Sequence, residues 1–415
     1  MVKIKAFQGL RPQAEFAEKL SSPPYDVLSS EEARIMADGN AISFLRVTKP
    51  EITYPTGSEP GGNDLYERAR VNLKALIDNG TMAFDKSPCI YIYRLTWRDV
   101  DQTGFMILSS VDDYLLGRIK RHEFTRPDKE ADRTKLNDVT NAQTGPVFLF
   151  YADSNDLDTI LQQECAKAPT YDFVAAEVRN RFWVVSEPQR VSQIVAGFAG
   201  LGATYIADGH HRCAAAANVC KQRRAQNPHY TGEEPEACFL SVVFPENQLK
   251  ILPYNRVVTD LMGLEPRDFI TKARERFAVD ELPEGKTVEP EVDRVIGMYL
   301  EKKWYKLTPL PNSYNQFDPI ESLDISILSR NLLEPVLGIT KPRTDKRIDF
   351  VGGIRGTKEL VKLVNSGKFK VAFAVPPVSL KALRSVADSG GVMPPKSTWF
   401  EPKLRDGMAV YVLNS

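Results

Sequence analysis

Two of the chain's four histidines stand side by side in the hexapeptide Ala-Asp-Gly-His-His-Arg, residues 207–212. The segment before it, Thr204–Ile206, is β-branched and aromatic and favours a buried strand, while the alanine-rich segment after it favours a helix that stops by Pro228. A turn at Gly209 would then present a helix N-terminus, whose N–H groups attract anions before any side chain is added. The alternative is a capping aspartate followed by two surface histidines.

The side chains of this turn suit phosphate chemistry. We expect the Gly209 backbone together with His210, His211 and Arg212 to bind an anionic group such as a phosphate. Asp208 would orient a histidine or contact Mg²⁺, a hard cation that prefers oxygen ligands.

Upstream, Arg121-His122-Glu123 contains a third histidine. An imidazole next to a carboxylate places an acid and a candidate base at one point of the chain. The alternative is a solvated charge cluster.

Two proline-stiffened segments carry further polar side chains. Residues 393–403 (MPPKSTWFEPK) offer Lys396, Ser397, Thr398 and Lys403, which could clamp phosphates or could belong to a crossing loop with surface lysines. Residues 22–27 (SPPYDV) form a stiff loop that we expect to be structural.

Composition excludes several classes of protein. The chain has 415 residues, of which 42% are hydrophobic, and equal numbers of basic and acidic side chains, 54 each. This balance argues against a nucleic-acid binder that relies on global positive charge. Five scattered cysteines without a CxxC, an N-terminus without a signal-peptide pattern and no apolar run of about 20 residues favour a cytoplasmic protein outside the membrane. P-loop, GxGxxG, HExxH and GxSxG motifs are lacking.

Strands and helices mix without strict alternation, which predicts an α+β fold. The elements expected around the candidate site are a strand at 40–48, a hairpin of 89–96 with 104–111, a helix at 128–140, and strands at 146–151 and 237–244. Beyond a predicted boundary near residue 260, a second domain, 261–415, includes helices at 267–277, 325–336 and 379–388.

The hexapeptide 207–212 resembles the ParB/sulfiredoxin-like superfamily, whose members bind nucleotide phosphates at a Gly-x-x-Arg turn that opens a helix. Within it, the archaeal free-serine kinases combine a Pro-His-Glu segment with a downstream Val-Asp-Gly-His-His-Arg turn; here these read 121–123 and 207–212, with Arg121 in place of the proline. This likeness covers about residues 112–225. Over its full length, with SPPYDV, HExT, ADGHHR, LPYNRVV and MPPKSTWFEPK, the chain resembles a large uncharacterised bacterial and archaeal family.

The resemblance implies a mixed-sheet ParB/sulfiredoxin-like core within a nucleotide-binding domain, 1–260, and an additional C-terminal α+β domain, 261–415, that contributes the Lys/Ser/Thr loop. It also implies a kinase that uses ADP or ATP with Mg²⁺ and phosphorylates free serine or a similar hydroxyl metabolite, with Glu123 as general base and His122 orienting it. The alternatives are a nucleotide-binding regulator without turnover and a metal-dependent phosphohydrolase that uses Asp208, His210, His211 and Glu123 as ligands.

Overall fold

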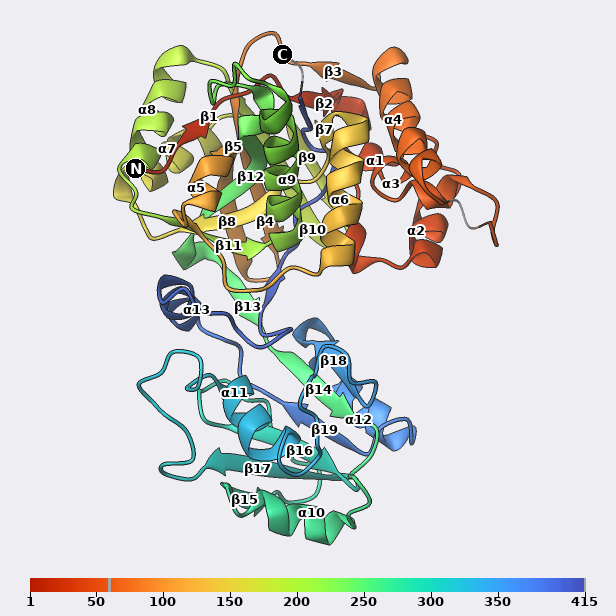
Figure 1. Cartoon of the computed structure of the whole chain (residues 1–415), viewed down its shortest axis with the longest axis vertical. Coiled ribbons are helices and arrows are strands. Elements are labelled where there is room, and N and C mark those ends of the chain that lie inside the picture. The colour runs from red at the N-terminus through yellow and green to blue at the C-terminus, as the bar shows by residue number, and fades with distance from the viewer. Residues whose placement is uncertain (59–60, 414–415) are drawn as a thin grey trace. The chain divides into compact units, whose positions relative to one another are not determined.

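The computed structural model describes residues 1–58 and 61–413, which divide into two compact units (Figure 1). The first comprises Met1–Leu249 together with Pro402–Ser415, and the second comprises Lys250–Glu401. The division therefore falls before the predicted boundary at residue 260, and the C-terminal segment belongs to the first unit. It is held there by backbone pairing of Asp406 with Ser22 and of Val410 with Leu10.

A nine-stranded mixed sheet forms the centre of the described part of the first unit, in the order β6-β11-β8-β12-β5-β4-β10-β9 with β1 beside β5. This confirms the predicted α+β class and mixed sheet. The strands are β1 (Ile4–Lys5), β4 (Ile90–Trp97), β5 (Val100–Ser110), β6 (Ile119–Lys120), β8 (Val147–Tyr151), β9 (Tyr171–Ala175), β10 (Val178–Val185), β11 (Thr204–Asp208) and β12 (Cys238–Pro245). The predicted hairpin, formed by β4 and β5, and the predicted strands at 146–151 and 237–244, which are β8 and β12, are confirmed.

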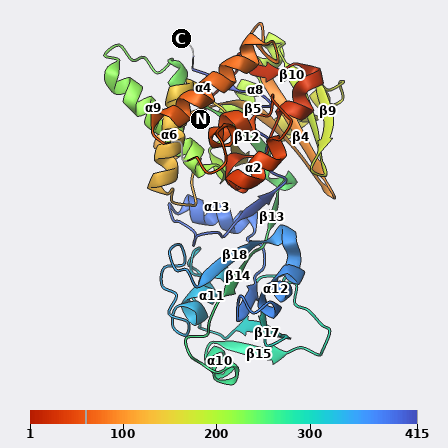
Figure 2. The same cartoon turned by 90° about the vertical axis from the view of Figure 1, so that its right-hand side faces the viewer.

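Helices α6 (Pro127–Thr140) and α9 (His210–Gln226) run side by side, as Figure 1 and Figure 2 both show. The small buried side chains Cys213, Ala216 and Ala217 let α9 pack closely on the sheet, where they join its apolar core. Helices α5 (Val111–Leu115), α7 (Asn155–Cys165) and α8 (Pro188–Ala199) also contribute side chains to that core.

One predicted strand is wrong. Residues 45–48 form a short helix, α3 (Leu45–Thr48), and not the strand predicted over 40–48. Phe44 and Val47 are three positions apart and both enter a small core with Leu73 and Leu76 of α4 (Asn63–Asp78), so the apolar residues serve one helical face.

The second unit contains an antiparallel sheet in the order β15-β17-β16-β19-β14-β18 within its described residues. Its strands are β14 (Tyr254–Val258), β15 (Phe277–Glu281), β16 (Ile296–Leu300), β17 (Lys303–Pro309), β18 (Ile348–Gly352) and β19 (Val371–Ala374), and its helices are α10 (Pro266–Ala273), α11 (Asp324–Leu328), α12 (Gly356–Asn365) and α13 (Leu380–Asp388). The predicted helix 325–336 begins as α11 and continues as a π-helical turn, 329–333. In the described residues of both units, no helix has the length and apolarity that a bilayer crossing needs.

Candidate functional site

The predicted strand, turn and helix around residue 209 are confirmed. Strand β11 ends at Asp208, and Gly209 precedes α9 with a φ of 92°. A side chain is strained at that backbone angle, and this strain, not a lack of space, is what favours glycine there. Because glycine has no side chain with which to cap the helix, the first N–H groups of α9 have no side-chain acceptor at the N-cap, and the positive end of the helix dipole faces the turn.

Asp208 is held by two donors. Lys403 Nζ lies 2.6 Å from Oδ2, and the Gly209 amide donates to Oδ1 at 2.8 Å. Burial alone would raise the pKa of Asp208, but Lys403, Arg212 and the Gly209 amide together hold it well below the usual range of a carboxyl. Of the lysines in the MPPKSTWFEPK segment, it is therefore Lys403 that meets the turn, as a partner of Asp208.

The two histidines of the turn hold the 121–126 loop against α9. The Arg126 amide donates to His211 Nε2 at 3.0 Å, and the His122 amide makes a longer bond, 3.5 Å, to His210 Nε2. The rings of His122 and His210 meet edge to face, with centroids 4.6 Å apart.

Burial keeps these rings neutral. His122 and His210 are only 2% and 6% exposed, so the alternatives of surface histidines and of a solvated cluster are wrong for these two rings. Burial lowers the pKa of His122 to about 4 and the pKa of His210 well below its usual value; the pKa of His211 is also lowered. The Nε2 atoms of His210 and His211 act as acceptors, which orients the loop that carries Glu123, and Glu123 itself is half-buried.

Arg212 is the main cation of the turn. It donates to the Pro146 carbonyl at 2.8 Å and lies 3.6 Å from Asp26 and 4.0 Å from Asp406. Its guanidinium and that of Arg133 lie over the Tyr25 ring, at 5.4 and 4.0 Å from the ring centroid. The SPPYDV loop thus supplies Tyr25 and Asp26 directly to the site, beyond the structural role expected of it.

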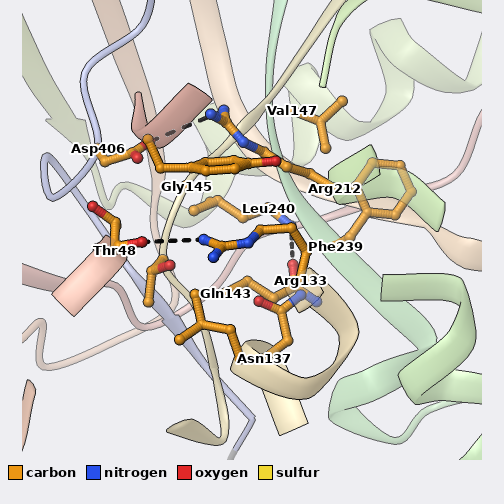
Figure 3. A pocket seen from close by; sticks show the side chains of 13 residues that line it. Thr48, Arg133, Asn137, Gln143, Gly145, Val147, Arg212, Phe239, Leu240 and Asp406 are labelled. Carbon is orange, nitrogen blue, oxygen red and sulfur yellow. Dashed lines mark hydrogen bonds and ion pairs between the residues drawn. The ribbon is translucent and has the colours of Figure 1, made fainter. Parts of the chain in front are cut away.

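Asp406 is a buried carboxylate beside a small cavity (Figure 3), and sequence reasoning did not identify it. It is 1% exposed, and neither oxygen has a hydrogen-bond partner among the described residues; its charge faces Arg212. The cavity measures about 20 Å³, which is room for one water. Gly145 is required beside it, because a Cβ there would lie 2.5 Å from Asp406 Oδ1.

Replacing Asp406 with asparagine is expected to change the pH dependence of stability. Burial, only partly offset by Arg212, raises the pKa of Asp406 to about 7. The folded state therefore holds this proton more tightly than the unfolded state, and the stability that it contributes is lost as pH rises from about 4 to about 7. In that window the wild type should lose about 1.4 kcal/mol of unfolding free energy per pH unit relative to Asp406→Asn. Above about pH 7 the difference between the two proteins should stay constant.

Urea unfolding of both proteins from pH 5 to pH 8 measures this difference. The lowered pKa values of His122 and His210 have the opposite effect, because a folded state with buried neutral histidines loses stability as pH falls below the usual pKa of histidine. They are present in both proteins and cancel in the comparison. Parallel stability curves would refute the assignment of a raised pKa to Asp406.

The magnesium contact predicted for Asp208 stays a prediction, because Mg²⁺ bound to nucleotide phosphates needs only one or two protein carboxylates. Both oxygens of Asp208 are engaged, and the described residues contain no group of three or more His, Cys, Asp or Glu side chains placed to hold a metal ion. The four ligands of the phosphohydrolase alternative therefore do not form a metal cluster in the described structure.

Lys396, Ser397 and Thr398 belong to the second unit, whereas Lys403 belongs to the first. There the Lys396 ammonium lies 5.5 Å from the Tyr254 ring centroid, and Ser397 is buried and donates to the Pro394 carbonyl. Their role in phosphate binding remains a prediction.

Comparison with solved structures finds weak likenesses. A free serine kinase in complex with AMP is 13% identical over 76% of this chain and 95% of its own, with a TM-score of 0.36. A conserved hypothetical protein from Pyrococcus furiosus is 14% identical over 74% and 95%, with a TM-score of 0.36. SbnI with a C-terminal truncation, from Staphylococcus aureus, is 13% identical over 74% and 87%, with a TM-score of 0.35. We draw no conclusion on activity from scores this low.

No curated protein matches the chain. A family match spans residues 4–326, which is most of the chain and includes every residue of the turn and of the 121–126 loop. The chain therefore belongs to the family described as "Protein of unknown function (DUF1015)".

Proposed function

We propose that the protein is a nucleotide-dependent kinase of a small hydroxyl metabolite, free serine or a compound like it, with ADP or ATP as phosphoryl donor. The carrying observation is the juxtaposition at the N-terminus of α9. An uncapped helix end, the Arg212 guanidinium and the Lys403–Asp208 pair lie at the turn, and two neutral histidines hold the Glu123 loop against it.

The roles of the predicted residues follow from these contacts. The amides of the first turn of α9 and Arg212 bind the phosphates, since transfer of a phosphoryl group needs charge neutralisation and positioning more than covalent chemistry. His210 and His211 are positioning residues, because their Nε2 atoms accept bonds from the loop backbone. His122 orients the loop through its contact with His210.

Glu123 is the general base. The substrate hydroxyl oxygen attacks the terminal phosphorus of the nucleotide, the new oxygen–phosphorus bond forms, and the bond to the departing nucleotide oxygen breaks. The hydroxyl proton passes to the Glu123 carboxylate. Magnesium, when bound to the nucleotide phosphates, would neutralise their charge; Asp208 is the one carboxylate of the turn that could face it, and we assign it no step.

Phosphorus NMR of the full chain tests the proposal. The protein is mixed with Mg²⁺, ADP or ATP, and a pool of hydroxyl metabolites that contains L-serine. A new phosphomonoester signal is expected. Free phosphate alone would favour the phosphohydrolase, and an unchanged spectrum with nucleotide bound would favour a regulator without turnover.

A further inference from the structure

The second unit contains a cavity, lined by both charged and apolar side chains, that the proposed kinase site does not use. Its volume is about 60 Å³, which is room for a few waters or for one small oxyanion group. Its walls come from Arg256 of β14, from residues 293–294, from the start of α11 and the residues before it, from the apolar segment 375–378 and the start of α13, and from Ser397 of the MPPKSTWFEPK segment. Two motifs of the sequence, LPYNRVV and MPPKSTWFEPK, thus meet at one place.

Arg256 is a buried charge without an acidic partner. It is 2% exposed, and its guanidinium donates to the carbonyls of Tyr254, Pro395 and Lys396, the last at 2.9 Å. Among the described residues no carboxylate pairs with it. Burial without a counter-charge lowers the pKa of Arg256 to about 9. A buried guanidinium without a counter-charge is strongly stabilised by a bound anion. Its hydrogen bonds to three carbonyls leave some of its five N–H donors available to an anion.

The rest of the cavity favours an anion as well. Ser379 caps α13, with its hydroxyl accepting from the Ala382 amide at 3.1 Å, so the positive end of that helix lies at the cavity wall. The half-buried Arg294 and the buried Asp324 pair with each other at 3.1 Å and cancel. Asp293, the remaining acid of the lining, is exposed.

We propose that this cavity binds the oxyanion group, carboxylate or phosphate, of a small ligand, with Arg256 as its counter-charge. The site lies wholly within the second unit and does not depend on the kinase proposal.

The test observes Arg256 directly in the full chain. Protein labelled with ¹⁵N in its arginine side chains is titrated with inorganic phosphate and, separately, with sodium acetate. The Arg256 Nε–H signal, assigned by its loss in Arg256→Lys, is expected to shift saturably with at least one of them. Saturation by phosphate identifies a phosphate group as the ligand chemistry, and saturation by acetate identifies a carboxylate.

An occluding variant separates a built site from general charge screening. Ala382→Leu places a larger side chain at the cavity wall, and Ser385→Leu adds the same side chain at an exposed position of the same helix. The anion affinity should fall by roughly tenfold or more in Ala382→Leu and stay unchanged in Ser385→Leu.

If Arg256→Lys does not fold, the two leucine variants still test the proposal, with the anion-dependent rise in melting temperature as the readout. That rise is expected in the wild type and in Ser385→Leu, and is expected to be smaller in Ala382→Leu. A shift that never saturates, or that is equal in both leucine variants, would overturn the proposal.

Discussion

Glu123→Gln is expected to slow phosphoryl transfer by about 10²–10⁴-fold while nucleotide affinity stays unchanged. Glutamine keeps the size of the side chain and its hydrogen-bonding capacity, but its amide cannot accept the substrate proton. The phosphates are assigned to the amides of α9 and to Arg212, none of which the change removes. Initial rates from the phosphorus NMR assay and calorimetric titration with nucleotide measure the two effects separately.

Asp128→Asn is the matched control, because Asp128 is an exposed carboxylate just past the same loop and its ion pair within the described residues is with exposed Arg126. It should leave both quantities unchanged. Equal activity of Glu123→Gln and the wild type would exclude Glu123 as the base. A loss of nucleotide affinity in Glu123→Gln would point instead to a role in binding.

The parts of this site that could be predicted are those that local sequence determines. The turn at Gly209 is bounded by a β-branched strand and an alanine-rich helix, so strand, turn and helix follow from neighbouring residues alone. The α6 helix is similarly local, with Pro127 at its first position and acidic residues in its first turn. The strand predicted over 40–48 was wrong because a short apolar pattern fits either period, and the surrounding core selected the helix.

The partners of the turn could not be predicted, because tertiary packing decides them. Lys403 meets Asp208 across 195 positions of the chain. In sequence, the run Lys396–Thr398 of the same segment is richer in phosphate ligands than the lone lysine beyond it. Asp406 resembles any surface aspartate in sequence, but it is buried in the folded chain, where its backbone pairs with that of Ser22. Tyr25 and Asp26 carried a usable signal, a polar pair directly after two prolines.

Arg212→Ala is expected to lower both stability and nucleotide affinity. Removing the guanidinium leaves Asp406 buried without its counter-charge, which costs about 3–5 kcal/mol of unfolding free energy when the carboxyl is ionised. Without Arg212 the pKa of Asp406 rises further, so the carboxyl stays neutral up to a higher pH, and the cost should be smaller at pH 6 than at pH 8. Urea unfolding at both pH values measures this.

A second substitution separates the structural effect from phosphate binding. In Arg212→Ala with Asp406→Asn the buried charge is gone, so much of the lost stability should return, and the two changes should be strongly non-additive. Nucleotide affinity should remain low in this double variant, because asparagine at 406 cannot replace the guanidinium at the phosphates. If calorimetric titration instead shows wild-type affinity once stability is restored, Arg212 only neutralises Asp406, and the phosphate site at the N-terminus of α9 must be held by other groups.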